Sequence, residues 1–300
     1  MENAFQNLWQ NPLWGKFQEA IGLKVWTVEI SGASALIIRH PLPFGLCWLE
    51  IPRGPLFGDK KDLSEVLKKV EEIGKTEKAV FIRFSPYEEA KISKVGRHKI
   101  VLSKHDHQPQ TSLIIDLSQT EEEILAQMHP KGRYNIKVAE RHEITVEESQ
   151  DIDAFYALLQ KTGGRDGFGI HPKSYYQKML AVFGPLCQLL IARHDGKPIA
   201  GGIFVYLDDW GIYYYGASDN AHRNLMAPYL VQWSAIKEAK RSGCKHYDFL
   251  GIAPEHVKNH PWAGVTEFKK KFGGKILNYP RAKEMVLRPF WHFLYRLLKR

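Results

Sequence analysis

Basic side chains beside an aromatic ring make residues 129–141, HPKGRYNIKVAER, the first candidate for chemistry. Cations spaced along a helix can follow a phosphodiester backbone or hold a nucleotide diphosphate. A solvated basic helix face explains the same pattern equally well. The candidate binding residues of this segment are Lys131, Arg133 and Tyr134. The segment has further cations at Lys137 and Arg141, and Glu140 is its only acid.

A second basic segment, WAGVTEFKKKFGGKILNYP, covers residues 262–280 and places three lysines between Phe268 and Phe272. If this segment is a strand, Lys269 and Lys271 project to one side and Lys270 projects to the other. A strand at the edge of a cleft would then offer two cations to one substrate. The alternative is a charged edge strand that resists aggregation.

The segment AHRNLMAPYLVQ, residues 221–232, connects a strand to a long helix, as in sites that hold a pyrophosphate at a helix N-terminus. Strand, turn, helix and strand after a D-G hairpin resemble the acyl-CoA-dependent N-acetyltransferase (GNAT) fold. In that superfamily the turn has a basic residue, matched by Arg223, followed by glycines. Met226 and Pro228 occupy the glycine places, and Pro228 suits the first helical position. We therefore expect a helix cap and no CoA site, although a CoA-dependent N-acyltransferase remains an alternative function.

The formal net charge of +9 and the pI near 9.2 favour an anionic partner, such as nucleic acid, a phosphorylated metabolite or a membrane surface. Part of this charge belongs on solvated lysine faces. A non-catalytic protein that binds RNA or membranes is a further alternative.

The cysteines and histidines do not predict a metal site or a disulfide framework. The three cysteines, Cys47, Cys187 and Cys244, contain no C-x-x-C pair. The histidines His98, His105 and His107, and the pair His256 and His260, have neither the carboxylate partners nor the helical frame of a zinc site. We expect no metal and no cofactor.

The chain ends suggest where the protein works. MENAFQNLWQ at the N-terminus lacks the basic and apolar regions of a signal peptide, and no apolar run reaches the length of a membrane span. We expect a cytoplasmic monomer. Residues 285–300 end in RPFWHFLYRLLKR, whose basic and aromatic residues suit either a helix on an anionic membrane or a helix packed on the first domain.

The elements that must position these residues occur in two similar series. The first half predicts a helix at 6–22, strands at 24–30, 34–40 and 46–57, a helix at 63–75 and a strand at 79–86. The second half predicts a strand–turn–strand at 186–209, a strand at 211–219, a helix at 227–243 and a strand at 244–252. Between them, Ser118 followed by three glutamates predicts a helix start. IIRH at 37–40 and IARH at 191–194 are expected in equivalent places, so two copies of one α/β unit are predicted.

Four motifs together resemble the FemABX family: R-Y-N-I at 133–136, G-I-H-P-K-S-Y-Y at 169–176, A-P-Y-L-V-Q-W at 227–233 and F-K-K-K-F-G-G at 268–274. The resemblance implies two tandem GNAT-like domains, with mixed sheets flanked by helices, and no coiled-coil arm. We expect residues 1–110 with 281–300 to form the precursor-binding domain. Residues 111–280 would form the aminoacyl-transfer domain, with a cleft between the two.

The resemblance also implies the activity. Members of this family move an amino acid from aminoacyl-tRNA to the stem-peptide amine of a peptidoglycan precursor, either UDP-MurNAc-pentapeptide or lipid II. The partners expected for this chain are therefore a charged tRNA and that precursor. Such a reaction builds interpeptide bridges and supports cell-wall biogenesis.

The roles of individual residues follow from the same resemblance. Trp14-Gly15-Lys16 matches a motif whose lysine binds the precursor's diphosphate, and Arg165 is expected at the same group. Tyr215 would line that pocket, and Asn135 joins the basic segment through R-Y-N-I. Phe268 and Lys269 match the family's catalytic pair, with the lysine close to the reacting ester.

One departure concerns the base. Ser85 stands where a related enzyme type has an aspartate before the proline that ends the first-domain strand. A dedicated carboxylate base is therefore not expected at this position. Attack of an amine on an aminoacyl ester can proceed through positioning and charge stabilisation, with Lys269 stabilising the developing oxyanion.

Overall fold

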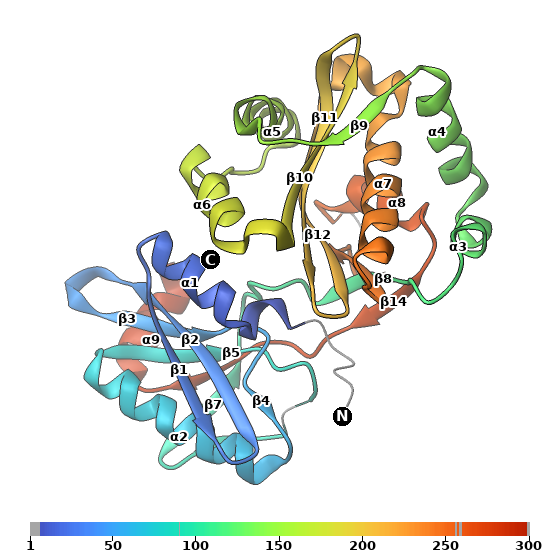
Figure 1. Cartoon of the computed structure of the whole chain (residues 1–300). Helices are drawn as coiled ribbons and strands as arrows, with labels where there is room; N and C mark the ends of the chain where they lie inside the picture. The colour runs from blue at the N-terminus through green and yellow to red at the C-terminus, as the bar shows by residue number, and fades with distance from the viewer. Residues whose placement is uncertain (1–6, 90, 256, 258–259, 299–300) are drawn as a thin grey trace. The chain divides into compact units, whose positions relative to one another are not determined.

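The computed structural model describes residues 7–89, 91–255, 257 and 260–298, and the chain divides into two compact units. Unit 1 comprises residues 1–110 together with 278–300, and unit 2 comprises residues 111–277. Each unit has its own sheet and its own hydrophobic core (Figure 1).

Unit 1 is built on a mixed sheet whose strands run in the order β1-β2-β3-β5-β15-β7-β6, with β4 paired to β2. The strands are β1 (Lys24–Ile30), β2 (Ala33–Pro41), β3 (Cys47–Ile51), β4 (Leu56–Phe57), β5 (Ala79–Phe84), β6 (Lys94–Val95), β7 (His98–Leu102) and β15 (Lys283–Val286). The helices are η1 (Leu8–Gln10), α1 (Pro12–Ala20), η2 (Pro43–Gly45), α2 (Lys60–Thr76) and α9 (Pro289–Leu298).

Local sequence explains the helix that crosses this sheet. Asp59 caps α2 by accepting hydrogen bonds from the backbone N–H groups of Lys61 and Asp62, and the Asp62 side chain accepts from the Asp59 N–H. The helix buries an apolar stripe against the sheet, made of Leu63, Val66, Leu67 and Val70. This crossover connects β3 to β5, which pair in parallel.

The C-terminal end of the chain completes unit 1. Strand β15 lies between β5 and β7 and pairs antiparallel with both. The buried Glu284 of β15 accepts from Arg83 of β5 at 2.6 Å and from Ser103 at 2.8 Å. It also lies 2.8 Å from Nε2 of His292 in α9. A buried ionised carboxylate needs such partners, and they hold the pKa of Glu284 down at about 2 although burial opposes this.

Unit 2 contains a mixed sheet in the order β14-β8-β13-β12-β11-β10-β9. Its strands are β8 (Thr111–Asp116), β9 (Thr145–Glu148), β10 (Cys187–His194), β11 (Lys197–Leu207), β12 (Trp210–Ser218), β13 (His246–Gly251) and β14 (Lys275–Asn278). Its helices are α3 (Glu121–Gln127), α4 (Pro130–Arg141), α5 (Ile152–Asp166), α6 (Lys173–Phe183), η3 (Gly184–Leu186), η4 (Asn220–Leu225), α7 (Ala227–Arg241) and α8 (Ala263–Lys270). The predicted D-G hairpin turn joins β10 to β11, with both turn residues at positive φ.

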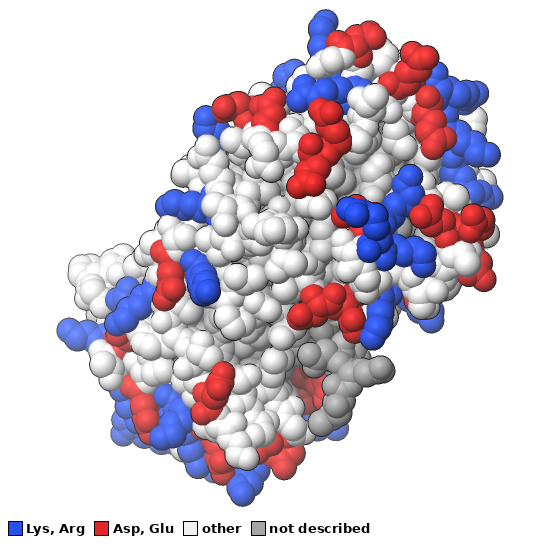
Figure 2. All heavy atoms as spheres, in the orientation of Figure 1, with Lys and Arg blue, Asp and Glu red and all other residues white. Residues whose placement is uncertain are grey.

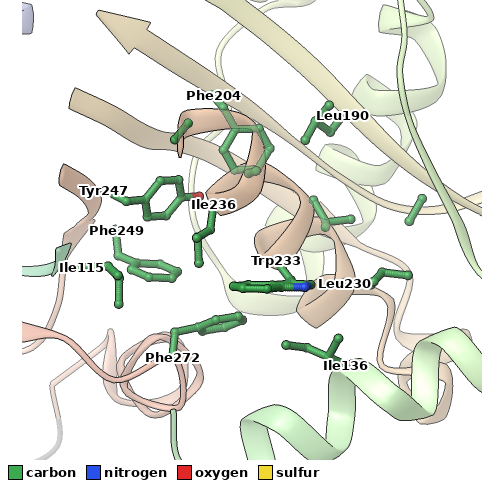
Figure 3. Close-up of a cluster of buried hydrophobic side chains, with 14 of the residues drawn as sticks. Ile115, Ile136, Leu190, Phe204, Leu230, Trp233, Ile236, Tyr247, Phe249 and Phe272 are labelled. Carbon is green, nitrogen blue, oxygen red and sulfur yellow. The ribbon is translucent and has the colours of Figure 1, made fainter. Parts of the chain in front are cut away.

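The core of unit 2 lies between the sheet and helices α4, α7 and α8 (Figure 3). Trp233 and Leu230 of α7 lie between the aromatic side chains of the sheet and Ile136 of α4. Gly132 allows α4 to approach closely, because a Cβ there would collide with the carbonyl oxygen of Lys271. Among the described residues, no helix combines the length and the apolar character that crossing a bilayer requires.

The two units share a topology, which confirms the GNAT-like fold class. In each, a helix connects two parallel strands, β3–α2–β5 in unit 1 and β12–α7–β13 in unit 2. An antiparallel strand then follows on the far side, β15 or β8. The predicted equivalence of IIRH and IARH is wrong, because β2 directly neighbours β3 whereas β11 separates β10 from β12.

Two further local predictions need correction. Residues 262–280 are not one strand, since α8 occupies the first half and only Lys275–Asn278 form a strand. The cap of α3 is Thr120 and not Ser118: Thr120 and Glu123 exchange side-chain and backbone hydrogen bonds in a capping box.

Candidate functional site

Strand β12 directs two tyrosines to opposite faces of the unit 2 sheet. Its pairing with β11 shifts by one residue, so that Tyr213 faces Phe204 and Tyr215 faces Ile203, with Tyr214 as the extra residue of a bulge. Without this bulge, positions 213 and 215 would share one face. Figure 1 shows α5 and α6 on one side of the sheet and α7 on the other.

On the face covered by α5 and α6, Tyr215 joins a cluster of aromatic rings from the GIHPKSYY segment. The Tyr215 hydroxyl donates to the hydroxyl of Tyr175 at 3.2 Å, and its ring lies 5.0 Å from that of Tyr176. His171 stacks on Tyr175, with ring centroids 3.9 Å apart. Burial raises the pKa of Tyr175 to about 12 and lowers the pKa of His171, so the cluster is uncharged at neutral pH.

Arg165 lies at the C-terminal end of α5, close to the end of β12. Its Nε and Nη2 donate to the two carboxylate oxygens of Asp166 at 2.6 and 2.7 Å, and its Nη1 donates to the Ser218 carbonyl. These contacts raise the pKa of Arg165, chiefly through the hydrogen bonds with Asp166. Arg165, the residue predicted to bind the diphosphate, is thus held in place by the carboxylate of Asp166, and its side chain remains partly exposed.

On the α7 face, the fold buries the side chain of Lys269. This residue belongs to α8, is only 7% exposed, and donates from Nζ to the carbonyl oxygen of Gly251 at 2.8 Å. Nζ also lies 5.5 Å from the ring centroid of Tyr213, within the range of a cation–π contact. Burial lowers the pKa of Lys269 to about 8, although Asp248 opposes this shift. An amine with this pKa can hold or release a proton near neutral pH.

The end of β13 provides the surroundings of Lys269. Asp248 is buried, and its Oδ1 accepts from the Ser112 hydroxyl at 2.8 Å and from the Leu250 N–H at 2.7 Å. Leu250 adopts a positive φ of 55°, and the pairing with β8 shifts register between Asp248 and Gly251. This irregular end of the strand turns the Gly251 carbonyl toward α8, where Lys269 caps it.

Phe268, the predicted partner of Lys269, packs into the core of unit 2. Its ring lies 4.9 Å from that of Tyr229 in α7 and 5.4 Å from that of Phe272. Thr266, three residues before Lys269, accepts from the Ala253 N–H at 2.8 Å. Phe268 therefore anchors α8 from one side and Thr266 from the other, which fixes the position of Lys269.

The basic residues of α4 separate into an exposed group and a structural group. Lys131, Tyr134 and Lys137 are exposed, and the Arg141 guanidinium lies 5.6 Å from the Tyr134 ring centroid. A surface depression beside them is lined by Tyr134, Lys137, Glu140 and Arg141. Figure 2 shows blue side chains along the upper right edge, where α4 lies in Figure 1.

Arg133 and Asn135 have structural partners instead. Arg133 donates from Nη1 to the carbonyl oxygens of Leu125, Ala126 and Met128, which caps the C-terminal end of α3. Asn135 makes a side-chain hydrogen bond with Tyr229 that opposes the burial-driven rise in the pKa of Tyr229. Both residues thus fix the position of α4.

The turn before α7 differs from a phosphate-binding turn. Met226 takes the left-handed conformation, with φ 57°, and packs against the core of unit 2. Pro228 occupies the second helical position, not the predicted first, and supplies no N–H to an anion. Position 226 thus has the left-handed backbone conformation that glycine favours, but it carries a methionine side chain where a phosphate-binding turn has a glycine.

In unit 1, Lys16 is an exposed residue of α1, and Ser85 belongs to a buried polar network. The Ser85 hydroxyl accepts from the Arg53 N–H and donates to the Gln108 side chain, which in turn donates to Glu50 at 3.2 Å. Ser85, which stands where a related enzyme type has an aspartate, is therefore connected through the Gln108 amide to the buried carboxylate of Glu50 on the neighbouring strand.

Glu50 is the centre of this network. It lies 2.8 Å from Nε2 of His40 and 3.2 Å from Nδ1 of His107. Its hydrogen bonds with His107 and His40 lower its pKa although burial opposes this. Sequence reasoning missed this cluster, and it named Asp248 only as one of three possible acids, with Asp116 and Glu267, without singling it out. An acidic residue inside an otherwise apolar strand, as in LCWLEI and HYDFLG, was the available signal, since buried charges need partners.

Among the described residues, no three His, Cys, Asp or Glu side chains gather as metal ligands. Of the pair His256 and His260, from which no metal site was expected, His256 lies outside the described residues.

Comparison with known proteins gives related sequences across the whole chain. The model of the FemAB family matches residues 1–106, 96–197 and 191–300. The lipid II:glycine glycyltransferases of Staphylococcus haemolyticus and Staphylococcus aureus (strain MRSA252) are 23% and 24% identical over 327 and 331 residues. These alignments cover 82% of this chain and 78% of each relative.

Solved structures share the fold. The crystal structure of FemX superposes with a TM-score of 0.81 at 19% identity and covers 96% of this chain and 93% of its own. A tandem GNAT protein from the clavulanic acid pathway gives a TM-score of 0.53 at 12% identity, covering 88% of this chain and 83% of its own. With a family model matched from end to end and two GNAT-like units in the fold, the chain belongs to the FemAB family.

Proposed function

We propose that this protein transfers an amino acid from aminoacyl-tRNA to the stem-peptide amine of a peptidoglycan precursor. Family membership and the relatives named as lipid II:glycine glycyltransferases support an aminoacyltransferase that acts in interpeptide bridge formation. Unit 1 would bind the precursor, with Lys16 at its diphosphate, and unit 2 would carry out the transfer.

The observation that carries the proposal is the buried ammonium group of Lys269. When the amine attacks the ester carbonyl, a C–N bond forms and negative charge collects on the carbonyl oxygen. The ester C–O bond then breaks, and the proton of the amine ends on the ribose oxygen. Lysine has three N–H donors, and among the described residues only Gly251 accepts from Lys269. The others can donate to the oxyanion.

Two arrangements in unit 2 support the substrate assignments. The exposed basic residues Lys131 and Lys137, with Tyr134 between them, suit the phosphates and unpaired bases at the end of a tRNA. Arg165 and the ring cluster around Tyr215 suit a diphosphate next to a neutral polar surface.

The test is mass spectrometry of precursor incubated with a mixture of charged tRNAs and the protein. The precursor is supplied in separate reactions as lipid II and as UDP-MurNAc-pentapeptide. We expect a mass increase of at least one amino acid residue, and Lys269→Ala should reduce turnover about 10²-fold or more, as loss of an oxyanion donor does. Absence of product with both precursors, or full activity of Lys269→Ala, would contradict the proposal.

A further inference from the structure

Helix α9 in unit 1 is apolar around most of its circumference, although only one side packs on the protein. On the inner side, Trp291 and Tyr295 pack against the cluster of Leu46, Trp48, Val80 and Phe81. On the outer side, large apolar side chains face solvent. A helix that is apolar on all sides is normally covered on all sides.

A neighbouring loop extends this surface. Phe44, at the connection between β2 and β3, is 84% exposed, and its ring lies 5.9 Å from that of Trp291. Trp291 in turn lies 5.6 Å from Phe290. We define the α9 patch as the exposed apolar side chains Phe44, Phe290, Phe293, Leu297 and Leu298, whose exposed fractions range from 46% to 84%.

Phe44 has a backbone conformation that requires an explanation. Its φ of 61° and ψ of 28° lie in the left-handed region, which disfavours residues with a Cβ. The ring gains little from packing within the chain, because most of its surface faces solvent. The fold therefore holds an aromatic side chain outward at a conformational cost, and such a cost is often kept for a binding role.

The two sequence segments that supply the α9 patch carry charges of one sign. Residues 287–300 contain basic residues and no Asp or Glu, and the same is true of residues 39–49. Arg288 is exposed at the N-terminal end of α9, and Lys104 donates to the carbonyl oxygen of Arg296 near its C-terminal end. The patch thus combines aromatic and leucine side chains with a basic border, which matches a membrane surface that contains anionic lipids.

We propose that the α9 patch docks unit 1 on an anionic bilayer, with α9 lying along the surface and Phe44 inserted beside it. Figure 2 shows an uncharged lobe at the left edge, where the β2–β3 connection lies in Figure 1, with basic side chains next to it. This docking would bring the protein to the membrane in which a lipid-linked precursor resides. The docking itself does not depend on the proposed transfer.

The first experiment measures binding of the full chain to vesicles by co-sedimentation. Mixed vesicles of phosphatidylcholine and the anionic phosphatidylglycerol are compared with vesicles of phosphatidylcholine alone. We expect binding to the anionic vesicles that weakens as salt increases. Phe290→Ala and Phe293→Ala should each lower the partition coefficient about tenfold, as expected for loss of one buried aromatic side chain. The matched control is Phe168→Ala in unit 2, where the phenylalanine is 47% exposed and should matter less than twofold.

The second variant separates docking from stability. Phe44→Gly relieves the left-handed strain, so its unfolding midpoint in urea should be equal to or higher than that of the wild type. Its vesicle binding should nevertheless fall about tenfold. Unchanged vesicle binding of Phe44→Gly, or no binding of the wild type to anionic vesicles, would overturn the proposal. Concentration-dependent dimerisation in analytical ultracentrifugation that Phe44→Gly abolishes would also overturn it and assign the patch to a second copy.

A further reaction distinguishes this proposal from the proposed function. Transfer to the soluble UDP-MurNAc-pentapeptide does not require a membrane, so Phe44→Gly should transfer to it at the wild-type rate. If soluble transfer occurs while vesicle binding fails, docking is refuted and the transfer stands. If vesicle binding behaves as expected while both precursors remain unmodified, docking stands and the transfer is refuted.

Discussion

Replacement of Lys269 by methionine tests the buried ammonium group through its effect on stability. The folded protein holds the pKa of Lys269 at about 8, against an ordinary value of 10.5. Since one pKa unit corresponds to about 1.4 kcal/mol, the charged lysine costs the folded state about 3 kcal/mol below pH 8. Between pH 8 and 10.5 the unfolded chain binds more protons at this group than the folded chain does, so wild-type stability rises with pH. Lys269→Met lacks this rise.

The assay is urea unfolding followed by tryptophan fluorescence, for both proteins at several pH values from 7 to 10.5. The stability of the methionine variant minus that of the wild type should fall by about 3 kcal/mol across this range. Loss of the bond to Gly251 adds an offset of about 1–3 kcal/mol that does not depend on pH. Lys270→Met serves as the control for loss of a lysine at a neighbouring position whose side chain reaches solvent. If the difference in unfolding free energy between Lys269→Met and the wild type stayed constant from pH 7 to 10.5, the assignment of a buried ammonium group to Lys269 would be refuted.

Three further outcomes are expected. Gly132→Ala should lower the free energy of unfolding by about 1–3 kcal/mol in urea titrations, because its Cβ would collide with a backbone carbonyl, whereas Gly164→Ala in α5 has open space and should be neutral or stabilising. Glu284→Gln should lower the free energy of unfolding by about 3 kcal/mol at pH 7. The lowered pKa of Glu284 makes this stability fully present above pH 4.5 and lost as the pH falls toward 2, so the variant's acid unfolding curve should be flatter there. Arg165→Ala should raise the KM for precursor about 10–100-fold with little change in kcat. The control Lys161→Ala, which removes an exposed ion pair, should leave the KM unchanged. An equal effect of both substitutions on the KM would argue against a specific ligand at Arg165.

The elements with strong local signals could be predicted from the sequence. Strand β1 occupies the predicted residues, Lys24–Ile30, because its alternating residues and flanking turn leave few alternatives. The hairpin at Asp195-Gly196 follows in the same way, since both positions favour the positive φ that a tight turn requires. In each case the deciding interactions lie within a few residues of one another.

The predictions that failed depended on how a side chain is used by distant neighbours. Three lysines in a row suggested an exposed strand, but Lys269 and Thr266 are three residues apart on the buried side of α8. Because lysine was treated as a surface residue, the helical spacing of Thr266 and Lys269 was not recognised. The same limitation applies to Arg133, whose capping partners in α3 could not be inferred from composition.

Site residues taken from the family pattern stay predictions, yet the structure adds their surroundings. Lys269 was predicted as a catalytic residue, but its bond to Gly251 depends on the irregular end of β13, which no local motif announces. Glu50 meets His40 and His107 only because β2 pairs with β3 and a loop returns after β7.

The placement of β15 has a consequence for how the protein is made. Residues 283–286 supply a strand between β5 and β7, so the sheet of unit 1 lacks an interior member until the ribosome has also released unit 2. Unit 2 is continuous from 111 to 277 and can fold as soon as it emerges. The first unit in the sequence is therefore the last to be completed. During translation its unpaired strand edges need protection from aggregation, and truncation shortly before residue 283 should affect the N-terminal unit more than the unit beside the cut.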